Sequence, residues 1–438
     1  MTKTGLIEMH QTKPANNLDS PIAPRELTFS NLRAIAFYLP QFHPIPENDE
    51  WWGKGFTEWH NVTKARPQFP GHYQPHLPAD LGYYDLRLTE VREAQAELAR
   101  QHGIHGFCYY HYWFNGRRIL ERPFNEVLAS EKPNFPFCLC WANENWTRVW
   151  DGGDKHVLLE QKYSAEDDLA HIQSLIPAFR DERYIRVNGK PLFLVYRAEL
   201  IPDPVRTTEI WREAAIKAGI GDLYLARVES YDSVHMNINA PSLGFDADVE
   251  FAPFSWNMGN VKFSGAFHRA LVAVGLLPKG FINNRVVDYD DMVRGMLSRP
   301  DVDWTRFPCV TPSWDNSARR KNASIFFGST PDKYEAWLRQ IVAQTSQKHV
   351  GEEKIVFINA WNEWAEGNHL EPDIKWGRAY LEATRRGLED IEAKLDQLIP
   401  YMQQSNGDGH PVVKQLYWKM QAFLKAQLDL LKNLGPKR

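Results

Sequence analysis

Residues 354–371 read KIVFINAWNEWAEGNHLE, and this stretch decides the predicted fold. A short apolar run rich in β-branched residues, 355–358, leads directly into asparagine, tryptophan and glutamate. A buried parallel strand has this composition when its C-terminal end opens into a site. Two carboxylates, Glu363 and Glu366, follow three residues apart. If the chain turns helically there, the two side chains share one face, with their Cβ atoms about 5–6 Å apart.

Seven further apolar runs precede this strand, and most of them alternate with segments of helical periodicity. We expect the strands in residues 33–43, 105–114, 135–146, 190–197, 223–230, 246–253 and 307–320. We expect the helices in residues 86–102, 123–132, 204–218, 289–297, 331–347 and 379–398, and one capped at its start by Ser164. Alternating strands and helices imply a parallel sheet, and eight units favour closure into a (β/α)8 TIM barrel.

Further segments precede, follow and interrupt this barrel. We predict a polar N-terminal arm in residues 1–31, the α/β barrel itself in residues 32–398, and a C-terminal helical extension in residues 399–438. Residues 254–300 contain an insertion before the helix at 289–297. No Gly-x-Gly-x-x-Gly turn follows the first strand, which argues against a doubly wound nucleotide-binding fold.

The composition is that of an ordinary globular protein. The chain has 438 residues, of which 43% are hydrophobic and 24% charged. Its net charge of −4 gives no reason to expect a nucleic acid or an anionic membrane as partner. The short basic cluster at residues 319–321 is typical of solvated surface. The 16 tryptophans are unusual, and aromatic faces are what carbohydrate sites place against sugar rings.

The four cysteines all fall inside apparent strands. Cys138 and Cys140 alternate, so they point the same way from one strand, and that is a poor geometry for a disulfide. We expect Cys108, Cys138, Cys140 and Cys309 to be reduced core residues. The N-terminus has no apolar signal region, and no apolar run is long enough to cross a bilayer. These features favour a cytoplasmic location.

Candidate site residues lie where strands end, because a barrel of this kind carries its active site at the C-terminal ends of its strands. We expect substrate contacts from Tyr38, Gln41 and His43; His111, Tyr112 and Trp113; Trp141, Asn143, Glu144 and Trp146; Glu229; Trp314 and Asp315; and Trp361 and Asn362. Glu58 and Trp59, in the long first loop, are candidates for a lid or an extra wall. Any one of these residues alone could equally be structural.

The chemistry that the sequence favours is carboxylate chemistry on a sugar. The histidines are scattered without metal-ligand spacing, and no Gly-x-Ser-x-Gly elbow is present. We therefore expect no metal and no cofactor, and an oligo- or polysaccharide as the partner; the oligomeric state stays open. Two carboxylates beside aromatic surfaces suit acid–base work at a glycosidic bond. A solvated pair of glutamates on a loop is the alternative explanation of the same motif.

Three long motifs resemble one family. They are YLPQFHPIPENDEWWGKGFTEWHNV at residues 38–62, WANENW at 141–146 and WNEWAEGNHLEP at 361–372. Over residues 33–385 the chain resembles the WbsX-type family, described as glycoside-hydrolase-family-99-like and often labelled glycosyltransferases of bacterial surface-polysaccharide synthesis. A more distant similarity, to family 99 endo-α-mannosidases, rests mainly on the Glu-x-x-Glu motif.

That similarity implies a retaining, metal-free barrel. One glutamate is thought to deprotonate the sugar 2-hydroxyl, which gives an anhydro-sugar intermediate, while the other acts as general acid and base. By motif position, Glu363 would be the 2-hydroxyl base and Glu366 the acid and base. The residues themselves favour the pair but leave the two roles open, although an apolar neighbour such as Trp364 can raise the pKa of an acid by desolvation.

The predicted function is therefore that of a retaining, glycoside-hydrolase-like enzyme acting on α-linked bacterial polysaccharide, mannose-containing chains among them. The first alternative is a glycosyltransferase of O-antigen, capsule or lipopolysaccharide biosynthesis. It ranks second because the sequence shows no glycine-rich cradle and no clear Asp-x-Asp for a donor diphosphate. The second alternative is a glycan-binding barrel without catalysis.

Overall fold

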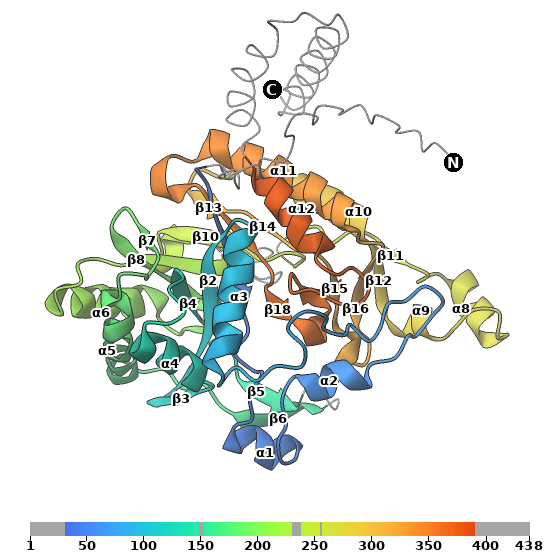
Figure 1. Cartoon of the computed structure of the whole chain (residues 1–438), viewed down its shortest axis with the longest axis horizontal. Helices are drawn as coiled ribbons and strands as arrows, with labels where there is room; N and C mark the ends of the chain where they lie inside the picture. The colour runs from blue at the N-terminus through green and yellow to red at the C-terminus, as the bar shows by residue number, and fades with distance from the viewer. Residues whose placement is uncertain (1–30, 149–152, 230–237, 255, 390–438) are drawn as a thin grey trace, which may run out of the picture.

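A ring of parallel strands forms the centre of the protein, seen in a computed structural model that describes residues 31–148, 153–229, 238–254 and 256–389 (Figure 1). In order around the ring, the strands are β1 (Arg33–Tyr38), β2 (Ile104–Phe114), β4 (Phe137–Trp141), β8 (Lys190–Val195), β9 (Tyr224–Glu229), β10 (Ala247–Glu250), β13 (Thr305–Phe307) with β14 (Cys309–Val310), and β17 (Ile355–Ile358). β17 then pairs with β1, and every pairing in the ring is parallel.

The ring closes through one run of chain, residues 305–310. Its first half, β13, pairs with β10, and its second half, β14, pairs with β17. Pro308 separates the halves because proline has no N–H for a ladder, but its carbonyl still accepts a hydrogen bond from the Phe357 N–H at 2.9 Å. Counted as one strand, this run makes eight strands within the described residues. The predicted (β/α)8 barrel is confirmed.

Helices cover the outside of the ring (Figure 1). They are α3 (Thr89–Gln101), α4 (Arg122–Ser130), α5 (Ala165–Arg180), α6 (Pro204–Lys217), α10 (Tyr289–Leu297), α11 (Pro331–Lys348) and α12 (Ala379–Leu388). Ser164 caps α5 as predicted, since its hydroxyl accepts from the Asp167 N–H. Between β9 and β10 the described residues form only a 3-10 turn, η3 (Pro241–Leu243).

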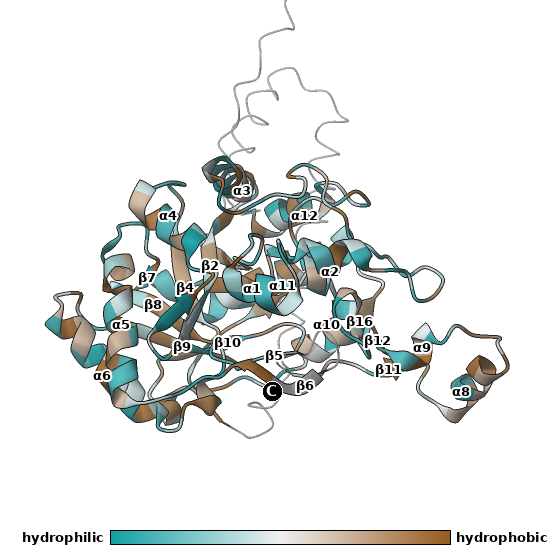
Figure 2. Cartoon of the chain, turned by 90° about the horizontal axis from the view of Figure 1, so that it is seen from below, coloured by the Kyte–Doolittle hydropathy of each residue, from teal (hydrophilic) through white to brown (hydrophobic). Residues whose placement is uncertain are grey.

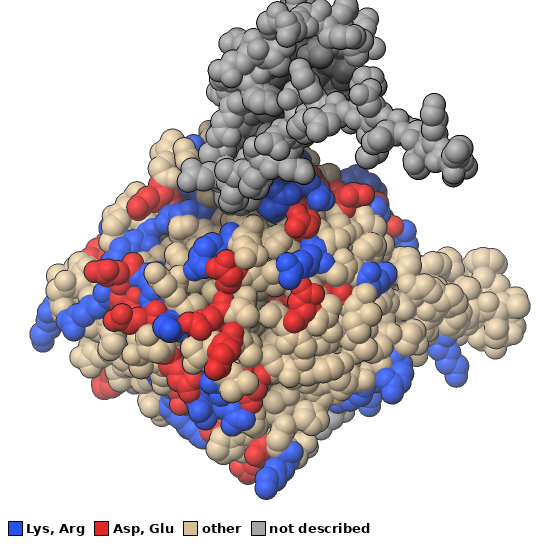
Figure 3. Space-filling model, viewed as in Figure 1, with Lys and Arg blue, Asp and Glu red and all other residues tan. Residues whose placement is uncertain are grey.

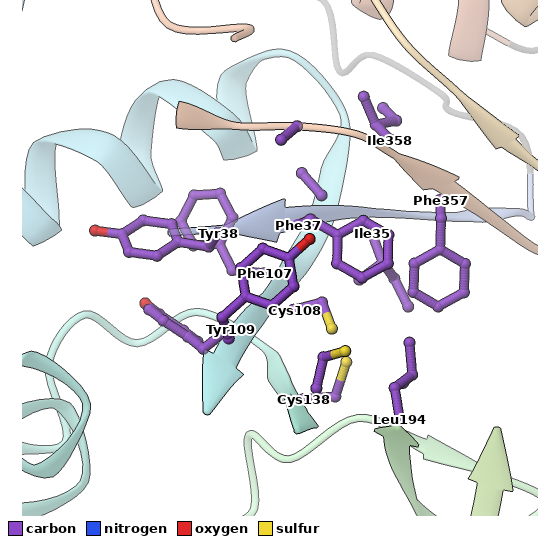
Figure 4. Packing of buried hydrophobic residues seen from close by; sticks show 14 of the residues in the cluster. Ile35, Phe37, Tyr38, Phe107, Cys108, Tyr109, Cys138, Leu194, Phe357 and Ile358 are labelled. Carbon is purple, nitrogen blue, oxygen red and sulfur yellow. The ribbon is translucent and has the colours of Figure 1, made fainter. Parts of the chain in front are cut away.

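The barrel interior is filled by alternate side chains of the strands. Phe37 stacks on Tyr110 and Phe357 with ring centroids 5.7 and 5.4 Å apart, and Cys108 and Leu194 complete the cluster (Figure 4). Burying each large apolar side chain contributes about 1.5–3 kcal/mol. The four cysteines are buried and unpaired, as expected from their positions in strands.

Two predicted strands are too long. The run predicted at 307–320 leaves the barrel after Val310, because Pro312 interrupts it and Asp315 caps a short turn, η4 (Asn316–Ala318). β15 (Trp314–Asp315) instead joins a side sheet with β16 (Ser324–Phe327), β12 (Arg285–Asp288) and β11 (Val261–Lys262). The third predicted strand ends at Trp141, and β5 (Trp146–Arg148) pairs with β6 (Gly153–Leu159) in a separate hairpin.

The insertion at 254–300 contains β11, α8 (Ala266–Ala273), α9 (Gly280–Asn283), β12 and the predicted helix α10. Its first helices project from the side of the barrel (Figures 1 and 2). The remaining short elements are α1 (Pro46–Trp52), α2 (Trp59–Lys64), β3 (Arg117–Ile119) and β7 (Arg186–Val187), and the turns η2 (Ala198–Leu200) and η5 (Gly351–Glu353).

The predicted C-terminal extension lies outside the described residues, as does the predicted N-terminal arm apart from its last residue, so these domain boundaries stay predictions. Among the helices that the structure describes, none combines the length and the apolar character needed to cross a bilayer.

Candidate active site

The candidate site is built on the turn that follows β17. β18 (Asn362–Glu363) and β19 (Asn368–His369) pair antiparallel, and η6 (Trp364–Glu366) forms a single 3-10 turn between them. Gly367 ends this turn with a φ of 54°, a conformation that favours glycine. The predicted helical turn between Glu363 and Glu366 is thus present, so the two side chains can reach the same neighbour.

That neighbour is Arg319. Its guanidinium donates a hydrogen bond to Glu366, and its Nη2 lies 4.0 Å from Glu363 Oε2. A third carboxylate belongs to Glu58, whose Oε1 lies 3.7 Å from Arg319 Nη1. Arg319 and Glu366 keep 15% and 13% of their side-chain surface exposed, whereas Glu58 keeps 1%. The cluster therefore has an accessible side, formed by Arg319 and Glu366, and a buried side, formed by Glu58.

The charges of this cluster do not balance, because three carboxyl groups share one cation. Burial raises the pKa of Glu363 well above its usual range, and the nearby Glu366 adds to that effect while Arg319 opposes it. Burial also raises the pKa of Glu58 against the pull of Arg319. Although burial alone would lower it, the pKa of Arg319 is raised by Glu366, Glu58 and Glu363. Glu363 therefore keeps its proton to a higher pH than a free glutamate does, while Glu366 is paired with the guanidinium.

Phenol and indole groups surround the carboxylates. The Tyr112 hydroxyl accepts a hydrogen bond from Gln41 Nε2 at 2.9 Å, and its ring meets the Trp146 ring edge-on at 5.4 Å. Burial, reinforced by the charge of Glu363, raises the pKa values of Tyr110 and Tyr112. The site thus combines acidic, phenolic and aromatic surfaces, as expected for a ligand with hydroxyl groups and apolar C–H faces.

Arg197 joins the chain that follows β8 to the loop that follows β4. Its Nη1 lies 2.7 Å from Glu144 Oε1, and its backbone carbonyl and N–H both bond the Asn143 amide at 2.8 Å. Burial raises the pKa of Glu144, with Arg197 opposing that rise. Both Glu144 and Glu366 raise the pKa of Tyr196, after burial, so these groups face one region of the mouth.

Several predicted residues lie on the outer face of the barrel instead. Successive side chains of a strand point to opposite faces, so every second strand-end residue meets a covering helix or loop. Tyr38 bonds Gln95 of α3, and Trp361 packs on Phe107. The others in this outer set, with their partners, are His111 with His171, Trp113 with Asp167, Trp141 with Trp211, and Glu229 with Arg299.

Other predicted residues support the site from behind. The Asn362 amide bonds both backbone groups of Leu39 and so joins the ends of β17 and β1. Trp59 packs on Trp364 at 5.7 Å. Asp315 accepts from Gln74 and lies 2.6 Å from His72 Nε2, and Trp314 packs on Phe254 at 4.7 Å. His43 is buried, which lowers the pKa of its imidazole to about 4.

Arg319 and Tyr110 are the functional candidates that sequence reasoning missed. The basic cluster at 319–321 was expected on the solvated surface, yet Arg319 turns inward while Arg320 is exposed. The available signal was position, since Arg319 follows the seventh predicted strand by only a few residues. Tyr110 could have been found by period-2 alternation with Tyr112 on β2.

The described residues also bring together one group of side chains able to hold a metal ion. Its members are His76, His369 and Asp373, all buried. His76 Nδ1 lies 2.9 Å from His369 Nε2, and Asp373 Oδ2 lies 4.0 Å from the same Nε2. Trp364 stacks on the His369 ring at 3.7 Å. The expectation that the protein needs no metal stays a prediction.

The chain belongs to the WbsX glycosyltransferase family, whose model, described as "Glycosyltransferase WbsX", matches residues 34–384. This confirms the resemblance seen in the three motifs. Two relatives, each named "Uncharacterized protein WxcX", come from two strains of Xanthomonas campestris pv. campestris. Each is 46% identical over 355 residues, which cover 81% of this chain and 49% of the relative. The chain spans about half the length of the curated relatives it matches.

Solved structures of similar fold include a glycoside hydrolase-like protein, 16% identical with a TM-score of 0.49, covering 85% of this chain and 98% of that one. A GH99 endo-α-mannosidase from Bacteroides thetaiotaomicron, in complex with bis-tris-propane, is 15% identical with a TM-score of 0.49. That match covers 84% of this chain and 100% of the mannosidase. Family membership rests on the family model and the Xanthomonas relatives.

Proposed function

We propose that this chain makes or breaks a glycosidic bond of a bacterial polysaccharide, with Glu363 and Glu366 as the reacting pair. The observation that carries the proposal is the electrostatic asymmetry of two glutamates that share Arg319 at the mouth of the barrel. Glycosidic chemistry needs one carboxyl group that gives a proton and one that is ionised, and unequal environments separate such roles.

In this proposal Glu363, whose pKa is raised by burial, donates its proton to the oxygen that leaves the sugar. Glu366, paired with Arg319, removes the proton of the 2-hydroxyl, and that oxygen attacks the anomeric carbon as the glycosidic bond breaks. Glu363, now ionised, then takes a proton from the molecule that opens the anhydro-sugar at the anomeric carbon. Glu366 returns its proton to the 2-oxygen, so both glutamates are regenerated and the configuration is retained overall. These roles are the reverse of those that motif position implies, and the raised pKa of Glu363 is what favours the reversal.

The proposed substrate is an α-linked chain, mannose-containing polysaccharide among the candidates, as the resemblance to endo-α-mannosidases implies. Trp146 stands between Tyr112 and Trp51, at centroid distances of 5.4 and 5.8 Å, and this aromatic wall suits the apolar face of a sugar ring. The Gln41 amide and the Tyr112 hydroxyl supply polar partners for sugar hydroxyls.

Transfer to a sugar acceptor is the second candidate, because the family is described as a glycosyltransferase. The same pair serves it if an acceptor hydroxyl, in place of water, opens the intermediate. Product analysis separates the two outcomes: added acceptor oligosaccharide yields a lengthened chain in a transferase and only shortened chains in a hydrolase.

The proposal is tested with Glu363→Gln and Glu366→Gln on α-mannosides and polysaccharide fragments. We expect each to lower turnover by about 10²–10⁴-fold, the usual range for a lost acid or base. Glu213→Gln, at an exposed carboxylate of α6, is the matched control and should leave turnover unchanged. Full turnover in both site variants would contradict the proposal.

The roles are separated by an aryl glycoside with a good leaving group, which does not need a proton from the enzyme. Such a substrate should restore the bond-breaking step in Glu363→Gln but not in Glu366→Gln. The opposite pattern of rescue would show that Glu363 is the 2-hydroxyl base and Glu366 the acid, as motif position implies.

A further inference from the structure

Residues 261–285, here called the arm, project from the side of the barrel and carry an unusual surface (Figures 1 and 2). Five of the 15 exposed large apolar side chains among the described residues lie in this short segment. Phe267 is 70% exposed and Leu276 is 72% exposed. On the face drawn in Figure 3 the arm is almost wholly uncharged. Concentrated apolar surface of this kind marks a contact with a membrane or a partner.

The charge of the arm favours a membrane with an anionic surface over a protein partner. Its charged side chains are all cationic, namely Lys262, Arg269, Lys279 and Arg285, and its sequence contains no aspartate or glutamate. Lys262 pairs with Asp288 at 2.7 Å, whereas the other three make no ion pair with a carboxylate of the described residues. The net charge of −4 for the whole chain hides this local excess of positive charge.

A cavity at the base of the arm contains part of this charge. It has a volume of about 420 Å³ and is lined by Lys262, Arg269 and Arg285, by Phe263 and Phe281, and by amide and hydroxyl side chains, with no carboxylate among the lining residues. The buried Nε of Arg285 has no hydrogen-bond partner within the described structure.

We propose that the arm binds the surface of an anionic phospholipid bilayer. The apolar side chains of α8 and of the loop after it enter the interface, and the cavity receives a lipid phosphate between Arg269 and Arg285. An apolar helix flanked only by cations is the pattern of an interfacial membrane segment, and each basic residue near an anionic surface adds to the attraction. This inference does not depend on the reaction proposed above.

The arm is connected to the candidate active site through the strands of the side sheet. β11 pairs with β12, β12 with β16, and β16 with β15, whose Asp315 begins the turn that leads to Arg319. Arg319 therefore lies in the connection between two strands, β15 and β16, of the sheet to which the arm belongs.

Sedimentation of the full chain with vesicles tests the proposal. We expect at least about tenfold stronger binding to vesicles of phosphatidylcholine with phosphatidylglycerol than to phosphatidylcholine alone, and weaker binding as salt screens the charges. The double variants Phe267→Ser with Leu276→Ser, and Arg269→Gln with Arg285→Gln, should each lower binding about tenfold or more. Val350→Ser with Ile374→Ser is the matched control, since these side chains are 78% and 68% exposed outside the arm, and it should bind as the parent does.

Circular dichroism and the melting temperature show whether each variant is folded. Absent or equal binding to the two kinds of vesicle overturns the proposal, and so does an equal loss in the control. If the chain does not bind vesicles but self-associates, and the double variant Phe267→Ser with Leu276→Ser abolishes that self-association, the arm is instead a contact between two copies of the chain. Binding of inorganic phosphate without binding of vesicles would also overturn it.

Discussion

Arg319 holds three glutamates around one guanidinium, and this single residue fixes the charge state of the candidate site. Without it, Glu58, Glu363 and Glu366 would be left together with little access to water. Breaking a buried ion pair by removing one partner costs about 3–5 kcal/mol, because an uncompensated charge stays behind. The site therefore depends on a cation that lies more than 40 residues from the glutamate pair in the sequence.

We predict that Arg319→Met lowers the free energy of unfolding by about 3–5 kcal/mol at pH 8 and by clearly less at pH 5. The difference arises because the carboxyl groups can take up protons at pH 5 and so lose their mutual repulsion. Urea denaturation at the two pH values measures it, with the exposed neighbour Arg320→Met as the control. An equal cost at both pH values would contradict the account.

Glu363 gives a second prediction at this scale. Its pKa is raised in the folded protein, so the folded state holds a proton that the unfolded state releases from about pH 4.3 upwards. The stability that this group contributes is full below that pH and is lost as the pH rises towards the folded pKa. Glu363→Gln, which mimics the neutral acid, should remove this loss.

The stability of Glu363→Gln relative to the parent protein should therefore increase between pH 4 and pH 8. Urea midpoints measured across that range test the expectation, and Glu213→Gln again serves as the exposed control. A difference that is constant with pH would show that Glu363 is ionised in the folded protein.

At the scale of elements, the turn η6 carries the chain from Glu363 to Glu366, and Gly367 ends this turn. A Cβ at this glycine would lie 3.0 Å from the Asp315 carbonyl oxygen, and the φ of 54° is already unfavourable for other residues. Since Asp315 begins the segment that carries Arg319, a shift here moves Arg319 relative to Glu366.

We predict that Gly367→Ala lowers stability by about 2–4 kcal/mol and lowers turnover with it, because strain and steric overlap add. Gly377→Ala is the matched control, because Gly377 has a φ of 52° and no atom lies within 4 Å of the added Cβ. This variant should lose only the stability that backbone strain costs, about 1–2 kcal/mol. Chemical denaturation compares the two. Equal costs would show that contact with Asp315 plays no part.

The elements themselves were largely predictable, because β-branched runs and helical spacing recur along the chain. α10 begins and ends where its pattern predicts, at Tyr289 and Leu297. The strand predicted at 307–320 was too long because its apolar and aromatic residues continue past Pro312 into another sheet. Alternation places Tyr110 and Tyr112 on the same face of β2, but sequence could not tell which face of a strand points inward, since a shift of one residue in register exchanges the two faces.

At the scale of the whole molecule, the closed barrel brings together segments that are far apart in the chain. Glu58 comes from the first loop, Arg319 from the connection between β15 and β16, and Glu363 from β18, which follows the last barrel strand. The motifs predicted the glutamate pair and the barrel that carries it. They did not predict the shared arginine. A run of three basic residues is typical of exposed surface, and only the tertiary contacts show that Arg319 is turned inward.

The central claim is that a sugar reacts between Glu363 and Glu366. A crystal structure of Glu366→Gln soaked with an oligosaccharide substrate tests it most directly. The account predicts a glycosidic oxygen within hydrogen-bonding distance of Glu363 and the 2-hydroxyl of the same sugar beside residue 366, with Arg319 in place. An oligosaccharide bound away from this turn, or with neither group in reach of the glycosidic bond, would contradict it.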